Sequence, residues 1–235
     1  MNDSQRPLSI EDAIRQARDM DAPLSQRLAM LAESVQRLAP SASNAVDRMA
    51  ARLREAGAGE AAPTIGDLMP RFILPDQEGK LVDLDRVLAN GPAAIVFTRG
   101  HWCPFCRLNT HALARIAGRV REMGRQLVAI TPERRRFTGM LRTETNAEFP
   151  ILTDMDNAYA FSLNLVIWVG EELQEIMMKG GRDLPLYQGN PSWLLPLPAT
   201  FIVASSGIIA DRFIDPDYRN RMDTDRLLAS LSAAS

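Results

Sequence analysis

Two cysteines separated by two residues are the groups in this sequence best suited to chemistry. Cys103 and Cys106 are the only cysteines of the 235-residue chain, and they enclose Pro104 and Phe105. A buried-strand pattern ends just before them and a helix pattern follows. Pro104 therefore fits the first helical position, where its missing N–H costs nothing. The spacing predicts that Cys103 caps the helix, with Cys106 one turn further along and less exposed.

The N-terminus of a helix favours the thiolate form of a cysteine, because its unpaired N–H groups stabilise negative charge. Arg99 and Arg107 can add positive charge at the same place. A thiol with a pKa of about 8.5 is roughly 3% ionised at neutral pH, whereas one with a pKa of about 6.5 is roughly 75% ionised. We therefore expect Cys103 to be the nucleophile and Cys106 to resolve it.

A metal site is the main alternative for this segment. The two cysteines and the only histidines, His101 and His111, lie within eleven residues. Zinc requires its four ligands to converge tetrahedrally, but on a helix Cys106 and His111 point about 140° apart. A buried, inert pair is a second alternative, and the hydrophilic turn at Gly100 and His101 argues against it. We expect no metal at this site, and His111 is interpreted as a structural or surface residue.

The elements that must position the pair follow a strand–helix–strand order. Ala93 to Thr98 is a continuous apolar run that predicts a buried strand. A helix is expected from Cys103 to about Met123, and a second buried strand from Gln126 to Thr131. The other predicted elements are a hairpin over 72–84, helices over 133–142, 154–161 and 223–231, a strand over 149–152 and a hairpin over 200–214. Residues 163–187 remain unassigned. The order predicts an α/β fold with a mixed sheet flanked by helices.

The first sixty residues show helical periodicity only. Apolar residues at spacings of three and four predict helices over roughly 10–17, 24–38 and 42–53. We therefore divide the chain into a helical extension, residues 1–60, and an α/β domain, residues 61–235. Such narrow apolar stripes need a partner surface, which is either the main domain or a second subunit in a homodimer.

Composition excludes several classes of function. The formal net charge is −2, so no electrostatic footprint for nucleic acid is visible. No run of about 18 apolar residues and no signal-peptide pattern occur, so neither a membrane span nor secretion is expected. We expect a cytoplasmic protein, in which a close cysteine pair is more often catalytic or redox-sensing than structural. No nucleotide-binding fingerprint is present, and no cofactor is expected.

The cysteine segment also carries a family resemblance. A strand, a Trp102-Cys-x-x-Cys turn and a later proline before a strand, Pro198, resemble the thioredoxin superfamily. Val96 to Cys106 is similar to a peroxiredoxin-like branch of the alkyl hydroperoxide reductase and thiol-specific antioxidant family. The resemblance extends from about residue 65 to residue 231 and implies a thioredoxin-like sheet.

The resemblance implies a thiol-dependent peroxidase. Cys103 would attack a hydroperoxide and become a sulfenic acid, and Cys106 would condense with it to a disulfide. A thioredoxin-, glutaredoxin- or glutathione-type thiol would then reduce the disulfide. Thr98 and Arg99 would hydrogen-bond the polarised peroxide.

Two further residues are assigned to the substrate site through the resemblance. Trp102 would lie beside the substrate, and Pro198 would match the cis-proline that faces the active-site disulfide. Gly100 and Val96 stand where typical peroxiredoxins carry Thr or Ser and Pro, and Pro198 and Ala199 stand where an Arg is usual. A disulfide oxidoreductase and a non-enzymatic redox sensor therefore remain alternatives.

Overall fold

A five-stranded mixed sheet forms the centre of the computed structural model, which describes residues 7–234. The strand order is β5 (Ile151–Thr153), β4 (Gln126–Thr131), β3 (Ala93–Phe97), β8 (Ala199–Val203) and β9 (Ile209–Ile214). The first three strands are parallel, whereas β8 runs antiparallel to β3 and β9 antiparallel to β8. This arrangement confirms the predicted α/β class and the thioredoxin-like sheet.

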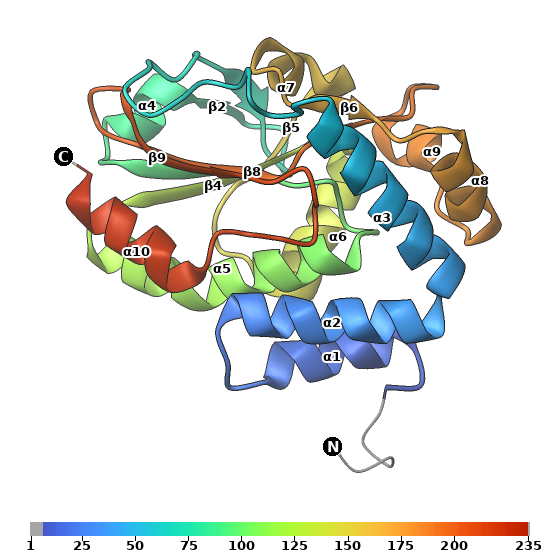
Figure 1. Cartoon of the computed structure of the whole chain (residues 1–235). Coiled ribbons are helices and arrows are strands. Elements are labelled where there is room, and N and C mark those ends of the chain that lie inside the picture. Colours follow the sequence, from blue (N-terminus) through green and yellow to red (C-terminus); the bar gives the residue numbers. More distant parts are fainter. Residues whose placement is uncertain (1–6, 235) are drawn as a thin grey trace.

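The central strand β3 shows how the sheet separates two apolar layers. All five of its residues are buried, as its unbroken apolar run predicts. Ala94 and Val96 face the cluster that contains α5 (Pro104–Glu122) and α10 (Thr224–Ala233). Ile95 and Phe97 face the opposite cluster, because successive side chains of a strand point to opposite faces. Figure 1 shows α5 and α10 along one face of the sheet.

The remaining elements connect or cover these layers. They are the strands β1 (Ile73–Pro75), β2 (Leu81–Asp83), β6 (Val166–Trp168) and β7 (Leu194–Pro196), the helices α4 (Leu84–Leu88), α6 (Arg135–Thr145), α7 (Ala158–Ser162), α8 (Glu171–Lys179) and α9 (Leu184–Gln188), and a 3₁₀ helix, Met155–Asn157. The segment without a sequence assignment holds β6, α8 and α9. Each is nine residues or shorter, which is too short for periodicity to identify.

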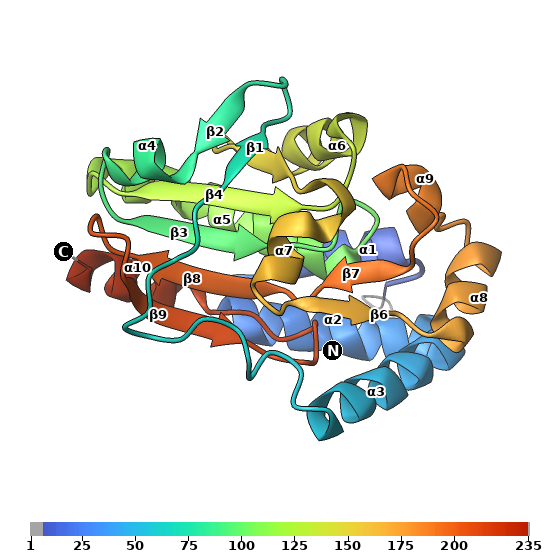
Figure 2. The same cartoon turned by 90° about the horizontal axis from the view of Figure 1, so that it is seen from above.

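Three helices precede the sheet, as predicted: α1 (Ile10–Asp19), α2 (Leu24–Leu38) and α3 (Pro40–Glu55). The Ser9 hydroxyl caps α1 by accepting the Asp12 N–H, and Pro40 begins α3. Helices α1 and α2 pack against α5, and α3 packs against α8 (Figures 1 and 2). The apolar stripes therefore lie on the main body of the same chain, although the division at residue 60 remains a prediction.

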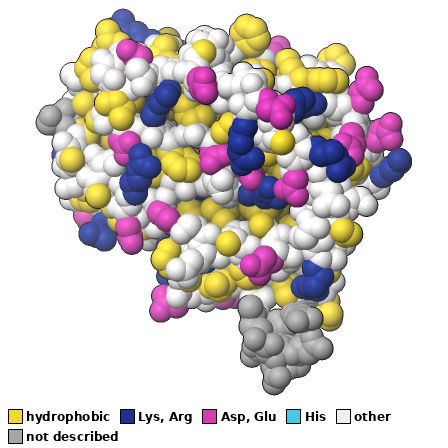
Figure 3. Space-filling model, in the orientation of Figure 1, with side chains coloured by type: hydrophobic (Ala, Val, Ile, Leu, Met, Phe, Trp, Pro, Cys, Tyr) yellow, Lys and Arg dark blue, Asp and Glu magenta, His cyan; other side chains and the backbone are white. Residues whose placement is uncertain are grey.

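The outside of the molecule carries mixed charge. Basic and acidic side chains are interspersed over the face seen in Figure 3, with no broad area of one sign. Among the helices that the structure describes, none is long and apolar enough to cross a membrane.

Candidate active site

The turn between β3 and α5 positions the cysteine pair. Cys103 is the N-cap of α5 with extended backbone angles, and Pro104 occupies the first turn, as predicted. Gly100 has a φ of +136°. A Cβ atom at that position would lie 2.4 Å from Cδ of Glu133, so only glycine fits.

Both cysteines are free thiols and both are buried. The exposed fraction is 1% for Cys103 and 0% for Cys106. The expectation that the hydrophilic turn exposes the pair is therefore wrong. The reason lies in the N-terminal helices: Leu28 and Leu31 of α2 share an apolar cluster with both cysteines and Phe105.

The expected ionisation of the pair is also reversed. Burial raises the pKa of the Cys103 thiol well above its ordinary value, and its hydrogen bond to Cys106 raises it further. The position at the helix N-terminus does not offset this desolvation. Burial alone would raise the pKa of Cys106 too, but the hydrogen bond from Cys103 and the charges of Arg221 and Arg99 hold it well below its ordinary value. The geometry thus favours a Cys103 thiol beside a Cys106 thiolate.

Donors from two distant segments converge on Cys106. The backbone N–H of Arg99 donates to its Sγ at 3.4 Å, and Nη2 of Arg221 donates at 3.6 Å. The Thr98 hydroxyl lies beside the same sulfur and has no other hydrogen-bond partner in the described part of the chain. Thr98 and the backbone N–H of Arg99 therefore lie at Cys106, whereas the Arg99 side chain lines the cavity beside Cys103. Their hydrogen bonds to a peroxide remain predictions.

Arg221 is a site residue that sequence reasoning missed. It lies in the loop between β9 and α10 and is 8% exposed. The arginine-rich stretch from Tyr218 to Arg221 follows the last predicted strand, and that was the only available signal. Its guanidinium places a positive charge beside Cys106.

The side chain of Arg99 is buried between two aromatic rings. Its guanidinium carbon lies 3.7 Å from the ring centre of Tyr218 and 4.9 Å from that of Trp102. Nε and Nη1 have no hydrogen-bond partner among residues 7–234. Arg107 is used differently, because it pairs with Glu11 of α1 at 2.6 Å and with Glu144 of α6 at 3.1 Å.

The predictions for Trp102 and Pro198 compare differently with the structure. Trp102 lines the cavity beside Cys103, and its contact with a substrate remains a prediction. The structure has no cis peptide bond in its described part, so the predicted cis bond at Pro198 is wrong. Pro198 is buried in the two-residue link between β7 and β8, where no tight turn calls for the rarer isomer. Thr200 of β8 pairs with Val96 of β3. If the same antiparallel pairing continued for two more residues, Pro198 would lie opposite Thr98.

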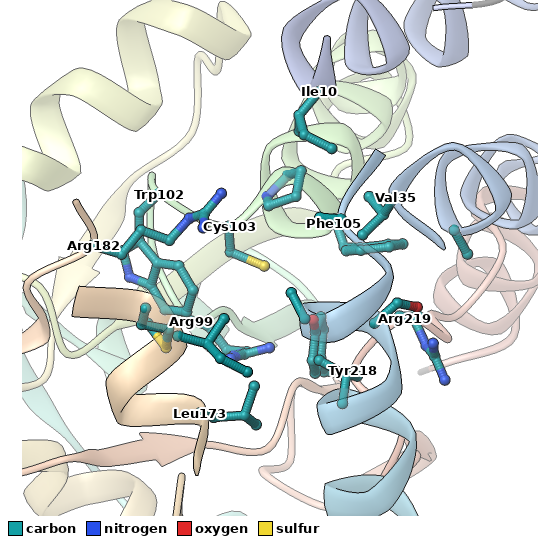
Figure 4. Close-up of a pocket in the computed structure, with 18 residues that line it drawn as sticks. Ile10, Val35, Arg99, Trp102, Cys103, Phe105, Leu173, Arg182, Tyr218 and Arg219 are labelled. Carbon is teal, nitrogen blue, oxygen red and sulfur yellow. The ribbon is translucent and has the colours of Figure 1, made fainter. Parts of the chain in front are cut away.

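A cavity of about 90 Å³ adjoins the Cys103 side of the pair (Figure 4). Its walls come from the N-terminal helices, from α8 and from the cysteine turn. Its labelled lining residues are Ile10, Val35, Arg99, Trp102, Cys103, Phe105, Leu173, Arg182, Tyr218 and Arg219. Cys106 does not line it. A small molecule in this cavity would therefore meet the sulfur of Cys103 first.

His101 belongs to a partly buried cluster that sequence reasoning did not identify. Its Nδ1 lies 2.6 Å from Oε1 of Glu133, and its backbone N–H donates to Oε2 at 2.8 Å. The ring stacks on Phe137 and meets Tyr187 edge-on. Burial raises the pKa of Glu133, and the contact with His101 opposes that rise. These contacts hold the backbone of the cysteine turn in place.

The histidines do not join the cysteines as ligands. His111 is half-buried, and burial together with the charge of Arg27 lowers its pKa to about 4. Within residues 7–234 no group of three or more His, Cys, Asp or Glu side chains could hold a metal ion.

Comparisons with known proteins agree with this geometry. Residues 65–212, more than half of the chain, match the AhpC/TSA family. The chain belongs to the AhpC/TSA family. The N-terminal helices of this AhpC/TSA chain lie outside the matched range. Comparison with curated protein sequences found no significant match.

Solved structures show the same fold. Peroxidoxin BcpB from Mycobacterium tuberculosis is 21% identical with a TM-score of 0.56, and the match covers 72% of this chain and 96% of that one. A cysteine-to-serine mutant of peroxiredoxin 6 from Arenicola marina is 15% identical with a TM-score of 0.54, covering 71% and 70%. Peroxiredoxin Q from Xanthomonas campestris is 16% identical with a TM-score of 0.51, covering 69% and 90%. The predicted family and fold are thus confirmed.

Proposed function

We propose that this protein is a thiol-dependent peroxidase that reduces hydroperoxides through Cys103 and Cys106. Membership of the AhpC/TSA family and the peroxiredoxin fold support a thiol peroxidase. The observation that carries the assignment of roles is the position of the two sulfurs. Cys103 lines the cavity, whereas Cys106 lies behind it among hydrogen-bond donors.

The first step oxidises Cys103. Its proton passes along the hydrogen bond to the Cys106 thiolate, and the Cys103 sulfur attacks the terminal oxygen of the hydroperoxide. An S–O bond forms, the O–O bond breaks, and the departing oxygen takes the proton back from Cys106. The products are a Cys103 sulfenic acid and an alcohol, or water when the substrate is hydrogen peroxide. Arg99 would stabilise the negative charge on the departing oxygen.

The second step resolves the sulfenic acid. The Cys106 thiolate attacks the Cys103 sulfur, an S–S bond forms, and hydroxide leaves and is protonated to water. Arg221 and the Arg99 N–H favour this step, because they keep Cys106 ionised. An external thiol donor then supplies two electrons to restore both thiols.

Burial argues for a small oxidant over a protein disulfide as substrate. A protein disulfide would have to reach Cys103, which is 1% exposed and lies behind α2 and α3. The same burial favours a small glutathione-type donor over a thioredoxin- or glutaredoxin-type donor. The Cys103–Cys106 disulfide and a cytoplasmic location, where thiol donors are available, are parts of this proposal. The homodimer, which was one of two alternatives predicted from the sequence, is not part of it.

The decisive experiment follows peroxide consumption with glutathione or thioredoxin as the donor. We expect turnover in the wild type and none in Cys103→Ser. Without a thiol donor, Cys106→Ser should consume one equivalent of peroxide, more slowly because Cys103 has lost its proton acceptor, and stop as a sulfenic acid that a dimedone-type probe will label. Full turnover by Cys103→Ser would reject the assigned roles. Oxidation of the wild type without any turnover would indicate a redox sensor instead.

A further inference from the structure

The cavity beside Cys103 contains more positive charge than the protein itself neutralises. Arg99, Arg182 and Arg219 line it, and no Asp or Glu does. Arg219 is neutralised by ion pairs with Asp217 and Asp47. Within residues 7–234, Arg99 and Arg182 have no carboxylate partner.

Arg99 is the unusual member of this group. Its side chain lines the cavity, its exposed fraction is 4%, and its Nε and Nη1 lack hydrogen-bond partners in the described chain. A buried cation with unused donors is costly unless an anion faces it. The thiolate of the cysteine pair supplies one negative charge, but Arg221 already donates to that sulfur.

Arg182 supplies a second unpaired cation at the same cavity. It follows α8 and is half-buried, and Figure 4 shows it beside Trp102 with its guanidinium on the side of Cys103. A guanidinium presents parallel donors that match a carboxylate. Arg99 and Arg182 together therefore suit a ligand with two separate oxygen-bearing groups.

The rest of the cavity is apolar. Val35 and Val46 of the N-terminal helices face it, as do Leu173 and Ile176 of α8. A volume of about 90 Å³ limits the ligand to a short carbon frame. The lining thus fits a short hydrocarbon frame held between polar ends.

We propose that the cavity selects small organic hydroperoxides that also carry a carboxylate, with Arg182 binding the carboxylate while the hydroperoxide group meets Arg99 and Cys103. The inference rests on the proposed peroxidase function and specifies its substrate class. Arg182 acts as a specificity residue, and no part of the oxidation chemistry depends on it.

The test compares two substrates on one carbon frame, tert-butyl hydroperoxide and 3-hydroperoxy-3-methylbutanoate. The rate constant for oxidation of the reduced protein is measured in a single turnover without any thiol donor. We expect the carboxylated substrate to react faster with the wild type. Arg182→Gln should lose that advantage by about tenfold or more, the scale of one charge-assisted hydrogen bond. The rate with tert-butyl hydroperoxide should change less than about twofold, because it has no group for Arg182 to bind.

Arg86→Gln is the matched control, because Arg86 is exposed on α4 and has no ion pair within the described chain. It should leave both rates unchanged, and Arg182→Lys should retain part of the preference. An equal loss on both substrates would overturn the proposal, since Arg182 would then act on the thiolate. No loss on either would overturn it as well.

A second experiment asks whether the carboxylate that Arg182 binds belongs to the hydroperoxide or to the thiol donor. Reduction of the oxidised protein by 3-mercaptopropionate is compared with reduction by 2-mercaptoethanol. If Arg182→Gln slows only the carboxylated thiol, the anion belongs to the donor and the proposal is wrong. If neither hydroperoxide oxidises Cys103 in the wild type, the proposed peroxidase function itself fails.

Discussion

The surroundings of Cys103 and Cys106 are built by different parts of the chain. Cys106 is enclosed by the β3 end and the β9–α10 loop, which supply the N–H of Arg99 and the guanidinium of Arg221. Cys103 faces a cavity whose walls come largely from the N-terminal helices and α8. The sheet region therefore controls ionisation, whereas the helices control access. The ionisation of Cys106 and the access to Cys103 can therefore be changed independently, by substitutions in different parts of the chain.

The largest expected effect concerns the Cys106 side. Arg221→Met removes a charged donor 3.6 Å from Sγ of Cys106, so the pKa of that thiol should rise. Disulfide formation after one turnover should slow by about 10- to 100-fold, the scale of a hydrogen bond to a charged group. Quenched-flow alkylation of the remaining thiols measures that rate. Arg221→Lys should retain most of the rate of disulfide formation. An unchanged rate in Arg221→Met would show that Arg221 does not support the ionisation of Cys106.

The next prediction concerns the helical cover of Cys103. Leu31→Ala leaves a cavity in α2 at a fully buried position and should lower the free energy of unfolding by about 2–5 kcal/mol. Because the cover loosens, alkylation of Cys103 by iodoacetamide should accelerate. Leu227→Ala is the matched control, since Leu227 is also buried, in the cluster between the sheet and helices α5 and α10. If both variants accelerate alkylation alike, global unfolding and not the helical cover governs access.

Thiolate absorbance against pH will decide which sulfur carries the charge. The pKa of Cys106 is held low and that of Cys103 is raised, so the wild type should show one step well below the usual thiol range. That step should persist in Cys103→Ser and disappear in Cys106→Ser. If the step instead disappears in Cys103→Ser and persists in Cys106→Ser, the thiolate is Cys103, at the N-terminus of α5.

The last prediction concerns a residue outside the site. His111 has a pKa lowered to about 4 by burial, so protons bind it more readily in the unfolded chain. Its contribution to stability should therefore fall as the pH drops from about 6.5 towards 4. Urea unfolding of wild type and His111→Asn across that range measures this difference. A difference that does not change with pH would contradict the lowered pKa, and the cysteine titration should be the same in both proteins.

Local patterns determined much of this protein. The apolar run of β3, Pro104 at the first helical turn and the three N-terminal stripes predicted their elements correctly, because such signals depend on neighbouring residues. The Cys-x-x-Cys spacing and its flanking strand identified the family and the position of the pair. The sequence thus determined which residues form the proposed redox centre.

Tertiary structure decided the environment of that centre. The recruitment of Arg221, the burial of Cys103 under α2 and the contact between Gly100 and Glu133 each join segments at least thirty residues apart. Because pKa values and access depend on such long-range burial and charge, no local pattern contained them. The sequence alone favoured a thiolate at Cys103 on the strength of the helix N-terminus, and desolvation in the folded chain reversed that preference.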